Sequence, residues 1–397
     1  METESFTASS PGRLEATMFA ERYATEQGWD VREVPGYGFV PDPLPPSFDP
    51  GEWLSELYPA IVAAERALSL LEGTARRLNN PHLLTGVFAQ REAILSSAIE
   101  NTFASAEDLA LLDLSPADLA DRNAAQEVAN YLRALNYGLK SKLPVCLRLV
   151  RQLHRELLSG VARQGVQPGE FRRTQNAIGA THSFGDAKFV PPPPRHVESQ
   201  LRDLETYLHR EDASLPRLVR FALIHYQFET IHPFLDGNGR VGRLLITLLL
   251  CEQGQLTKPL VYVSGFFEKR RSEYYERLLR VSTNGEWVAW IAFFLEAIAS
   301  QSQDAVQRAD RLLDLQEEMK TAVTQKQASS LLPILVDALF SYPYVTASRV
   351  ESLCDCSTQT AWSLIRRLVE KGILREITQR ARNKVFEASR ITDLIMN

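Results

Sequence analysis

The sequence has few cysteines, no long apolar run and no excess of positive charge. Its four cysteines, Cys146, Cys251, Cys354 and Cys356, are too few and too unevenly spaced for a disulfide framework. No stretch of about 18 uninterrupted apolar residues occurs, and the first residues lack the basic and apolar pattern of a signal peptide. We therefore expect a cytoplasmic protein that does not span a membrane.

The charge balance and the length limit the class of protein further. The formal net charge of −5 provides no general positive field for nucleic acid or an anionic membrane surface. Any such binding would need a local patch. With 397 residues, of which 45% are hydrophobic, the chain can form two or three cores, and we expect a multidomain protein.

The pattern along the chain predicts a mainly α fold. Residues 1–52 are rich in Pro and Gly, and Phe39–Pro46 cannot propagate a helix, so this part is expected to be an extended arm. Residues 53–300 have apolar side chains three and four positions apart, which predicts a helical core. Residues 301–330 carry a helical apolar stripe and are expected to be a helical linker.

Two segments depart from the helical pattern. The segment Thr181–Val190 places a Gly-Asp turn between short extended flanks, which predicts a small β-hairpin. Residues 331–397 predict a helix, a short helix, a longer helix and then a pair of strands. This order resembles a winged helix-turn-helix domain.

A loop between two apolar helices, predicted at 215–230 and 240–252, carries the clearest chemical signal. Gly237, Asn238 and Gly239 come directly before the second helix. Backbone N–H groups in such a turn converge on an anion, and the positive end of the helix dipole adds to the attraction. We therefore predict a phosphate site at this turn.

The side chains around the turn suit nucleotide chemistry. Asp236 offers an oxygen ligand for Mg²⁺, which prefers one or two carboxylates together with substrate phosphates. Arg240 and Arg243 are three positions apart on the first helical turn, so both guanidinium groups could reach one polyphosphate. His232 has an intrinsic pKa near neutrality and could accept a proton from an attacking hydroxyl.

The complete pattern, His232-Pro-Phe-x-Asp-Gly-Asn-Gly-Arg-x-x-Arg243, resembles the signature of Fic-domain proteins. The resemblance implies a Fic-type helical core that transfers AMP from ATP to a Ser, Thr or Tyr hydroxyl of a target protein, with self-modification as a further option. It implies that His232 is the general base and that Asp236 holds Mg²⁺. Phosphate binding would fall to Gly237, Asn238, Gly239, Arg240 for the diphosphate and Arg243 for the γ-phosphate.

A second stretch is similar to the flap of the family. It consists of Gly169–Gly179 followed by Phe189–Pro194. The resemblance implies that Lys188, Phe189 and Val190 bind an extended segment of the target by strand addition. The Pro-rich arm is also similar to the segment that precedes many Fic domains.

A third stretch, Phe267–Tyr275, resembles a family helix near the nucleoside, but Arg270 stands where family members often carry Asn. This departure puts the nucleoside pocket in doubt. The choice of ATP therefore rests on the resemblance, because the loop motif addresses only phosphates.

A helix predicted at about 83–104 carries a further motif. Its apolar stripe predicts packing on the core through Leu84, Val87, Phe88, Leu95, Ile99 and Phe103. Ser96–Asn101 resembles the inhibitory motif of Fic proteins, which implies that Glu100, with Ser96, pairs with Arg243 at the γ-phosphate position. Such a carboxylate competes with phosphate for the same donors. In some relatives this glutamate is thought to position water for removal of AMP, so reversal stays open.

Two alternatives address the same loop. Gly237–Gly242 fits the dinucleotide fingerprint GxGxxG, but a helix rather than a strand is predicted before it. His225, His232 and Asp236 suggest a metallohydrolase, although the two histidines are seven residues apart.

An alternative of another class makes the protein a DNA-binding regulator that acts through its C-terminal domain. The helix near Ser357–Arg367 would enter the major groove. A basic cluster there would suit phosphates: Arg366, Arg367, Lys371, Arg375, Arg380, Arg382 and Lys384. Acidic residues interrupt this cluster, and such domains also bind proteins. A homodimer is a further open option.

Overall fold

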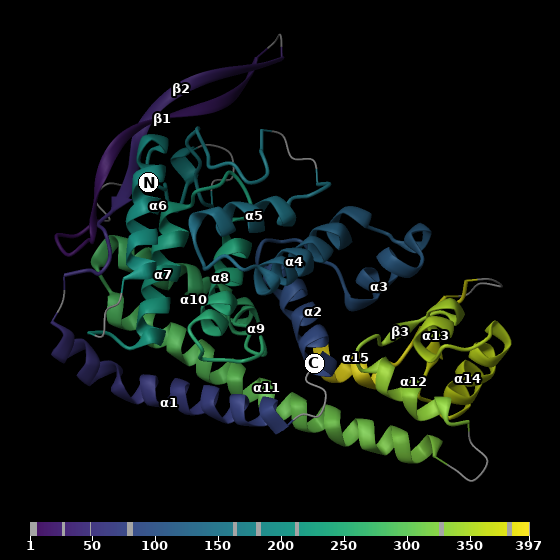
Figure 1. Cartoon of the computed structure of the whole chain (residues 1–397). Helices are drawn as coiled ribbons and strands as arrows, with labels where there is room; N and C mark the ends of the chain where they lie inside the picture. The colour runs from purple at the N-terminus through teal and green to yellow at the C-terminus, as the bar shows by residue number, and fades with distance from the viewer. Residues whose placement is uncertain are drawn as a thin grey trace.

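The computed structural model describes residues 6–25, 28–47, 49–77, 82–161, 165–179, 184–210, 214–324, 329–378 and 383–396. Within these ranges the chain is mainly helical, as the sequence predicts, and most helices gather in one body (Figure 1). None of the described helices is both long enough and apolar enough to cross a membrane.

The body is built from eleven α-helices among the described residues. They are α1 (Pro50–Arg77), α2 (His82–Ile99), α3 (Ala106–Leu114), α4 (Arg122–Lys140), α5 (Leu147–Leu157), α6 (Pro194–His209), α7 (Arg217–Ile231), α8 (Asn238–Glu252), α9 (Ser264–Lys269), α10 (Arg271–Asn284) and α11 (Trp287–Val323). Short 3₁₀ turns lie at Pro116–Asp118 and Phe184–Asp186.

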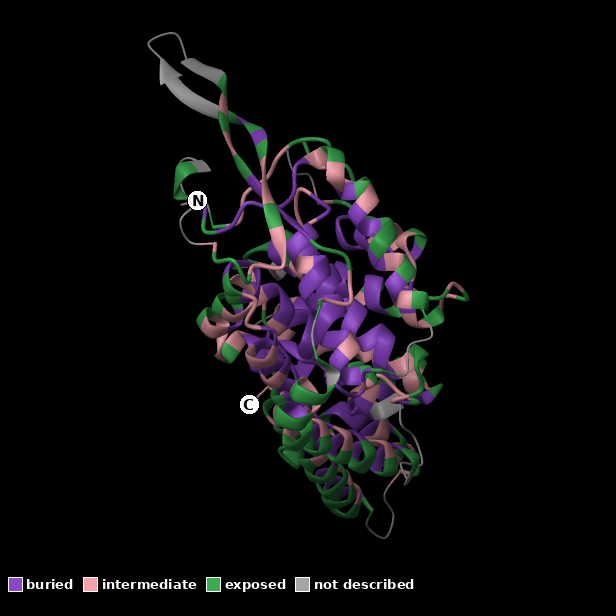
Figure 2. Cartoon of the chain, turned by 90° about the vertical axis from the view of Figure 1, so that its left-hand side faces the viewer, coloured by how far each residue is buried: buried purple, intermediate pink, exposed green. Residues whose placement is uncertain are grey.

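Helices α7 and α8 lie at the centre of the body. Apolar residues occur on all sides of both helices, and a helix of that kind is stable only when neighbours cover it on every side. Figure 2 shows the buried interior and the exposed outer helices. The indole of Trp290 on α11 donates to the carbonyl of Ala222 on α7 at 2.9 Å. This packing fixes the two ends of the loop that joins α7 to α8.

Helix α11 continues from the body into the predicted linker. It packs along α1 and contains neither Gly nor Pro between Trp287 and Val323. Nothing in this sequence therefore ends the helix at residue 300. The boundary that we expected there lies inside one continuous helix.

The N-terminal arm is extended, but it is also paired. Strands β1 (Gly12–Thr25) and β2 (Gly28–Pro41) form an antiparallel ribbon in which Gly12 faces Pro41 and Thr25 faces Gly28. The ribbon projects from the body (Figure 2). At its base Phe39 is completely buried, and its N–H donates to the carbonyl of Val190 at 2.9 Å.

The hairpin expected at Thr181–Val190 lies partly outside the described residues, because residues 180–183 are not among them. In the described part, one antiparallel bridge joins Ile178 to Phe189. The Gly-Asp pair lies in the 3₁₀ turn at Phe184–Asp186.

The helix expected at about 83–104 is shorter at its end. Helix α2 stops at Ile99, the next residues form a turn, and Asn101 has a left-handed backbone with φ of 59°. Phe103 lies beyond the helix and is 68% exposed, so our expectation that it belongs to the buried stripe is wrong. The early end places Glu100 on a turn.

The C-terminal unit follows α11. It contains α12 (Leu331–Leu339), β3 (Tyr344–Val345), α13 (Ala347–Cys354), α14 (Thr358–Glu370), β4 (Arg375–Glu376), β5 (Phe386–Glu387) and α15 (Ser389–Met396). The strands form a small sheet in the order β3-β5-β4. The classification as a winged helix stays a prediction.

Candidate active site

The loop between α7 and α8 is closed by its own residues. His232 ends α7 with a left-handed backbone (φ 48°), and Gly237 precedes α8 in the same region (φ 79°), where glycine has no Cβ penalty. The side chain of Asn238 accepts from the N–H of Phe234 and donates to its carbonyl, both at 2.8 Å. The sequence assigned Asn238 to phosphate, but its side chain holds the loop, which leaves its backbone N–H for an anion.

Two residues that sequence analysis did not single out, Arg172 and His154, hold this loop through hydrogen bonds and ring stacking. The buried Arg172 donates to the carbonyl of His232 at 2.9 Å and to that of Pro192 at 2.5 Å. His154 stacks on Phe234 with ring centroids 3.7 Å apart. Its Nδ1 accepts from Gly169, so Nε2 carries the proton and donates to the carbonyl of Asp236 at 3.0 Å.

The His232 ring is oriented by a backbone carbonyl. Its Nδ1 lies 3.2 Å from the carbonyl oxygen of Glu229, which can only accept, so Nδ1 carries the proton and Nε2 keeps its lone pair. Burial lowers the pKa of His232 to about 4, against the opposing charges of Glu100 and Asp236. The imidazole is therefore neutral at physiological pH, as a general base must be.

Arg243 on α8 is completely buried and bonded to the end of α2. Its Nε donates to Oγ of Ser96, and its Nη2 donates to the Ser96 carbonyl, each at 2.8 Å. Nη2 also lies 2.9 Å from Oε1 of Glu100. Although burial favours the neutral acid, the charge and hydrogen bond of Arg243 hold the pKa of Glu100 below its ordinary value. The structure thus brings Ser96, Glu100 and Arg243 together.

The carboxylate of Glu100 covers the start of α8. A Cβ added to Gly239 would collide with Oε1 of Glu100 and would lie 2.8 Å from Nη1 of Arg243. An anionic group therefore already rests against the glycine turn where the sequence predicts phosphate. Only glycine leaves room for an anion this close to the backbone.

Arg240 has a different environment from Arg243. Its side chain is 1% exposed, and Nη1 lies 2.8 Å from Oε2 of Glu127 on α4. Its Nη2 is 3.6 Å from Oδ2 of Asp236, whose side chain is 25% exposed. Arg240 thus links the loop to α4, and Asp236 is the more accessible of the two partners.

Glu229 is a second acid in the site, and sequence analysis did not predict it. Burial, partly offset by Arg243, raises the pKa of its carboxyl to about 8. A Cβ added to Gly242 would collide with its Oε1, so Glu229 packs against α8 one turn beyond Gly239. Its place on α7 three residues before His232 was the available signal.

The flap residues are used partly by the chain itself. Lys188 is exposed, whereas Phe189 and Val190 are buried. The N–H and carbonyl of Phe189 pair with Ile178, and the carbonyl of Val190 accepts from Phe39 of β2. The Val190 carbonyl is therefore already bonded to the N-terminal ribbon, and target binding by Lys188, Phe189 and Val190 stays a prediction.

The dinucleotide-binding and metallohydrolase alternatives for this loop do not fit its geometry. A helix, α7, precedes the glycine turn, which excludes the dinucleotide motif as predicted from βαβ context. His225 is 2% exposed, bonds to the hydroxyl of Tyr274 at 2.8 Å and stacks among aromatic rings, so it does not join His232 and Asp236. Across the described residues, no three His, Cys, Asp or Glu side chains are grouped for a metal.

Arg270, the residue that departs from the family pattern, is tied to two acids. It lies 2.8 Å from Glu273 and 2.7 Å from Glu296, and it covers the ring of Phe266 at 4.8 Å. Through these contacts Arg270, between α9 and α10, is held by ion pairs and by an aromatic ring.

Sequence comparisons match most of the helical body. Residues 144–250 match the Fic/DOC family, and residues 58–140 match the Fic/DOC family N-terminal region. A protein adenylyltransferase Fic of Drosophila grimshawi is 32% identical over 166 residues, 42% of this chain and 31% of that protein. A protein of the same name in Drosophila melanogaster is 27% identical over 287 residues, 67% of this chain and 55% of that protein. The chain thus spans about a third to about half of these relatives.

Solved structures share the fold. A Fic family protein from Desulfovibrio desulfuricans G20 has a TM-score of 0.54 at 22% identity and covers 83% of this chain and 96% of its own. A Fic domain containing signaling protein from Bacteroides thetaiotaomicron has a TM-score of 0.51 at 19% identity, with 62% and 97% covered. The loop from His232 to Arg243 lies within the match to the Fic/DOC family, and the solved structures show that the chain shares their fold.

Proposed function

We propose that this chain transfers AMP from ATP to a hydroxyl side chain of a target protein. The observation that carries the proposal is the position of a neutral imidazole, with Nε2 available as a base, in the loop that opens α8 as an anion site. The naming of the Drosophila relatives as protein adenylyltransferases supports the same reaction.

In the proposed reaction, Nε2 of His232 takes the proton from the target hydroxyl. The hydroxyl oxygen then forms a bond to the α-phosphorus of ATP, and the bond to the departing pyrophosphate breaks. The Glu229 carbonyl stabilises the protonated imidazole through Nδ1. Arg172 holds the backbone of His232, so the base keeps its direction.

The backbone N–H groups of Asn238 and Gly239 and the N-terminus of α8 would hold the phosphates. Arg240 and Arg243 add positive charge below them. Asp236, one accessible carboxylate beside this turn, fits the ligand set of Mg²⁺, which would neutralise charge on the phosphates when bound. One protein carboxylate suffices because substrate oxygens and water complete the coordination.

We further propose that Glu100 inhibits the transfer. Its carboxylate already bonds to Arg243 and lies against Gly239, so a γ-phosphate would have to displace it. The negative charge of the same carboxylate raises the pKa of His232. Removal of AMP is therefore a second activity to be measured at this site.

Mass spectrometry of a cell lysate tests the proposal. The Glu100→Gly protein and ATP should add AMP to hydroxyl side chains of lysate proteins or of the chain itself, and parallel reactions with GTP, CTP and UTP test the nucleotide. The double variant Glu100→Gly/His232→Ala is the control. AMP addition of equal extent by both proteins would contradict the assigned base.

A further inference from the structure

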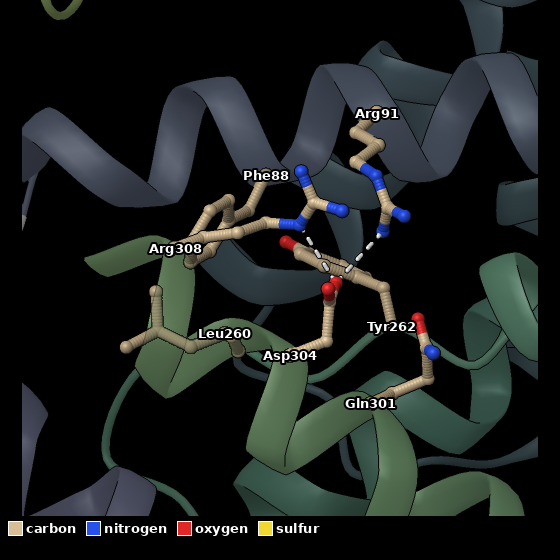
Figure 3. Close-up of a pocket in the computed structure, with 8 residues that line it drawn as sticks. Phe88, Arg91, Leu260, Tyr262, Gln301, Asp304 and Arg308 are labelled. Atoms are coloured by element: carbon tan, nitrogen blue, oxygen red, sulfur yellow. Dashed lines mark hydrogen bonds and ion pairs between the residues drawn. The ribbon is translucent and has the colours of Figure 1, made fainter. Parts of the chain in front are cut away.

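A small cavity lies where α2 meets α11, away from the loop at His232. Its lining includes Arg91 of α2, Tyr262, and three residues of α11: Gln301, Asp304 and Arg308. Figure 3 shows both guanidinium groups directed at Asp304, with the Tyr262 side chain extending toward them. The empty space, including its open side, is about 250 Å³.

The cavity contains more positive than negative charge. Nε of Arg308 lies 2.7 Å from Oδ2 of Asp304, and Nη1 of Arg91 lies 3.5 Å from the same oxygen. One carboxylate thus serves two guanidinium groups. Glu92, beside Arg91, directs its carboxylate instead to Ser264 and Tyr131. Burial, and next the charge of Arg308, lower the pKa of Arg91.

Two residues that line the cavity each carry one buried polar atom without a protein partner. The two atoms are Nε of Arg91 and the hydroxyl of Tyr262, and neither bonds to any other described residue. Arg91 is 9% exposed, Arg308 is 8% exposed and Tyr262 is 6% exposed. A buried donor without a partner destabilises the folded state, and a charged donor does so more strongly. A ligand that accepts hydrogen bonds would pair with these two donors, and its negative charge would balance the excess positive charge of the cavity.

We propose that this cavity binds a small inorganic anion, held by Arg91, Arg308 and the Tyr262 hydroxyl. The excess positive charge favours an anion over water. The limited room restricts the ligand to a halide or a compact ion of similar size. This site is separate from the phosphate site and does not depend on the proposed reaction.

The location gives such an anion a structural consequence. Arg308 also donates to the carbonyls of Leu394 and Ile395 at 2.6 and 3.1 Å, at the end of α15. Arg91 is on α2, the helix that ends beside Glu100. An anion between the two arginines would therefore join α2 to the C-terminal unit through α11.

Bromide tests the site directly because its anomalous scattering distinguishes it from water. In crystals of the full chain soaked in sodium bromide, we expect an anomalous peak within hydrogen-bond distance of Nε of Arg91 and the Tyr262 hydroxyl. In solution, bromide should raise the melting temperature by about 1 °C or more over sodium gluconate at equal ionic strength, and the shift should grow with the logarithm of the bromide concentration.

Three variants separate this site from general salt effects. Arg91→Met should abolish the bromide-dependent shift, and Tyr262→Phe, which removes only the hydroxyl, should weaken apparent affinity about tenfold. Arg390→Met removes an exposed ion pair with Glu318 between α15 and α11 and should keep the full shift. A water peak without anomalous signal, or equal shifts in Tyr262→Phe and the unchanged protein, would overturn the proposal.

Discussion

Two arginines at the loop of the helical body and the basic residues of the C-terminal unit differ in burial. Arg240 and Arg243 have side chains only 1% exposed and are paired with Glu127 and Glu100. In the C-terminal unit, Arg366 and Lys371 are exposed. Of the predicted basic cluster, Arg375 pairs with Glu387 and Lys384 with Glu376, while Arg380 and Arg382 lie outside the described residues.

This difference indicates what each region can do. Buried arginines are held in fixed positions by their partners, so they suit a site that must stabilise charge at one place. Exposed cations move and are screened by salt, so they support only loose attraction to a partner. The structure therefore favours the body as the site of chemistry.

Loss of the base should have the largest effect. In the Glu100→Gly background, His232→Ala should lower AMP transfer by about 10²- to 10⁴-fold, since a general base contributes that much. Transfer is measured with α-labelled ATP. His209→Ala, at the exposed end of α6, is the control and should retain full activity. Equal rates in the two histidine variants would remove His232 from the mechanism.

Release of the carboxylate should have the next largest effect. Glu100→Gly should raise AMP transfer about ten- to hundredfold, because one charge-assisted hydrogen bond to Arg243 is worth about 1.5–3 kcal/mol. Ser96→Ala should raise it less, since Glu100 still pairs with Arg243. Initial rates at subsaturating ATP measure both. A Glu100→Gly protein no faster than the unchanged chain would exclude this brake.

The rate of AMP transfer should fall at a lower pH than it would with an exposed histidine as the base. Because the base acts when neutral, its activity is lost as pH falls through its pKa, which burial places at about 4. Removal of Glu100 lowers that pKa further, since the carboxylate raises it. Rates of Glu100→Gly should therefore stay constant from about pH 6 to 8. A fall centred near pH 6.5, as for an exposed histidine, would contradict the buried base.

The C-terminal unit should give the smallest effect. If its exposed cations bind DNA, a gel shift with the full chain should weaken steeply as salt rises, and Arg366→Ala should reduce the salt slope by about 1. Arg76→Ala on α1 is the control. DNA binding that does not change with salt, or no DNA binding, would contradict the DNA-binding hypothesis and favour a protein partner for this unit.

Short-range patterns predicted much of the fold. The helices expected at 215–230 and 240–252 are observed as α7 and α8, because apolar periodicity and the turn residues between them act over a few positions. The N-terminal arm was predicted as extended but not as a paired ribbon. Its pairing depends on contacts between β1, β2 and the body rather than on local sequence.

The twelve residues from His232 to Arg243 determined the loop, its glycine turn and the residue types available for chemistry. Only the tertiary structure decided which charges meet there. Glu100, Glu127, His154 and Arg172 come from other parts of the chain and reach the loop through packing. The physical reason is that a buried charge without a partner strongly destabilises the fold. Each buried arginine therefore pairs with a carboxylate that the tertiary structure places next to it.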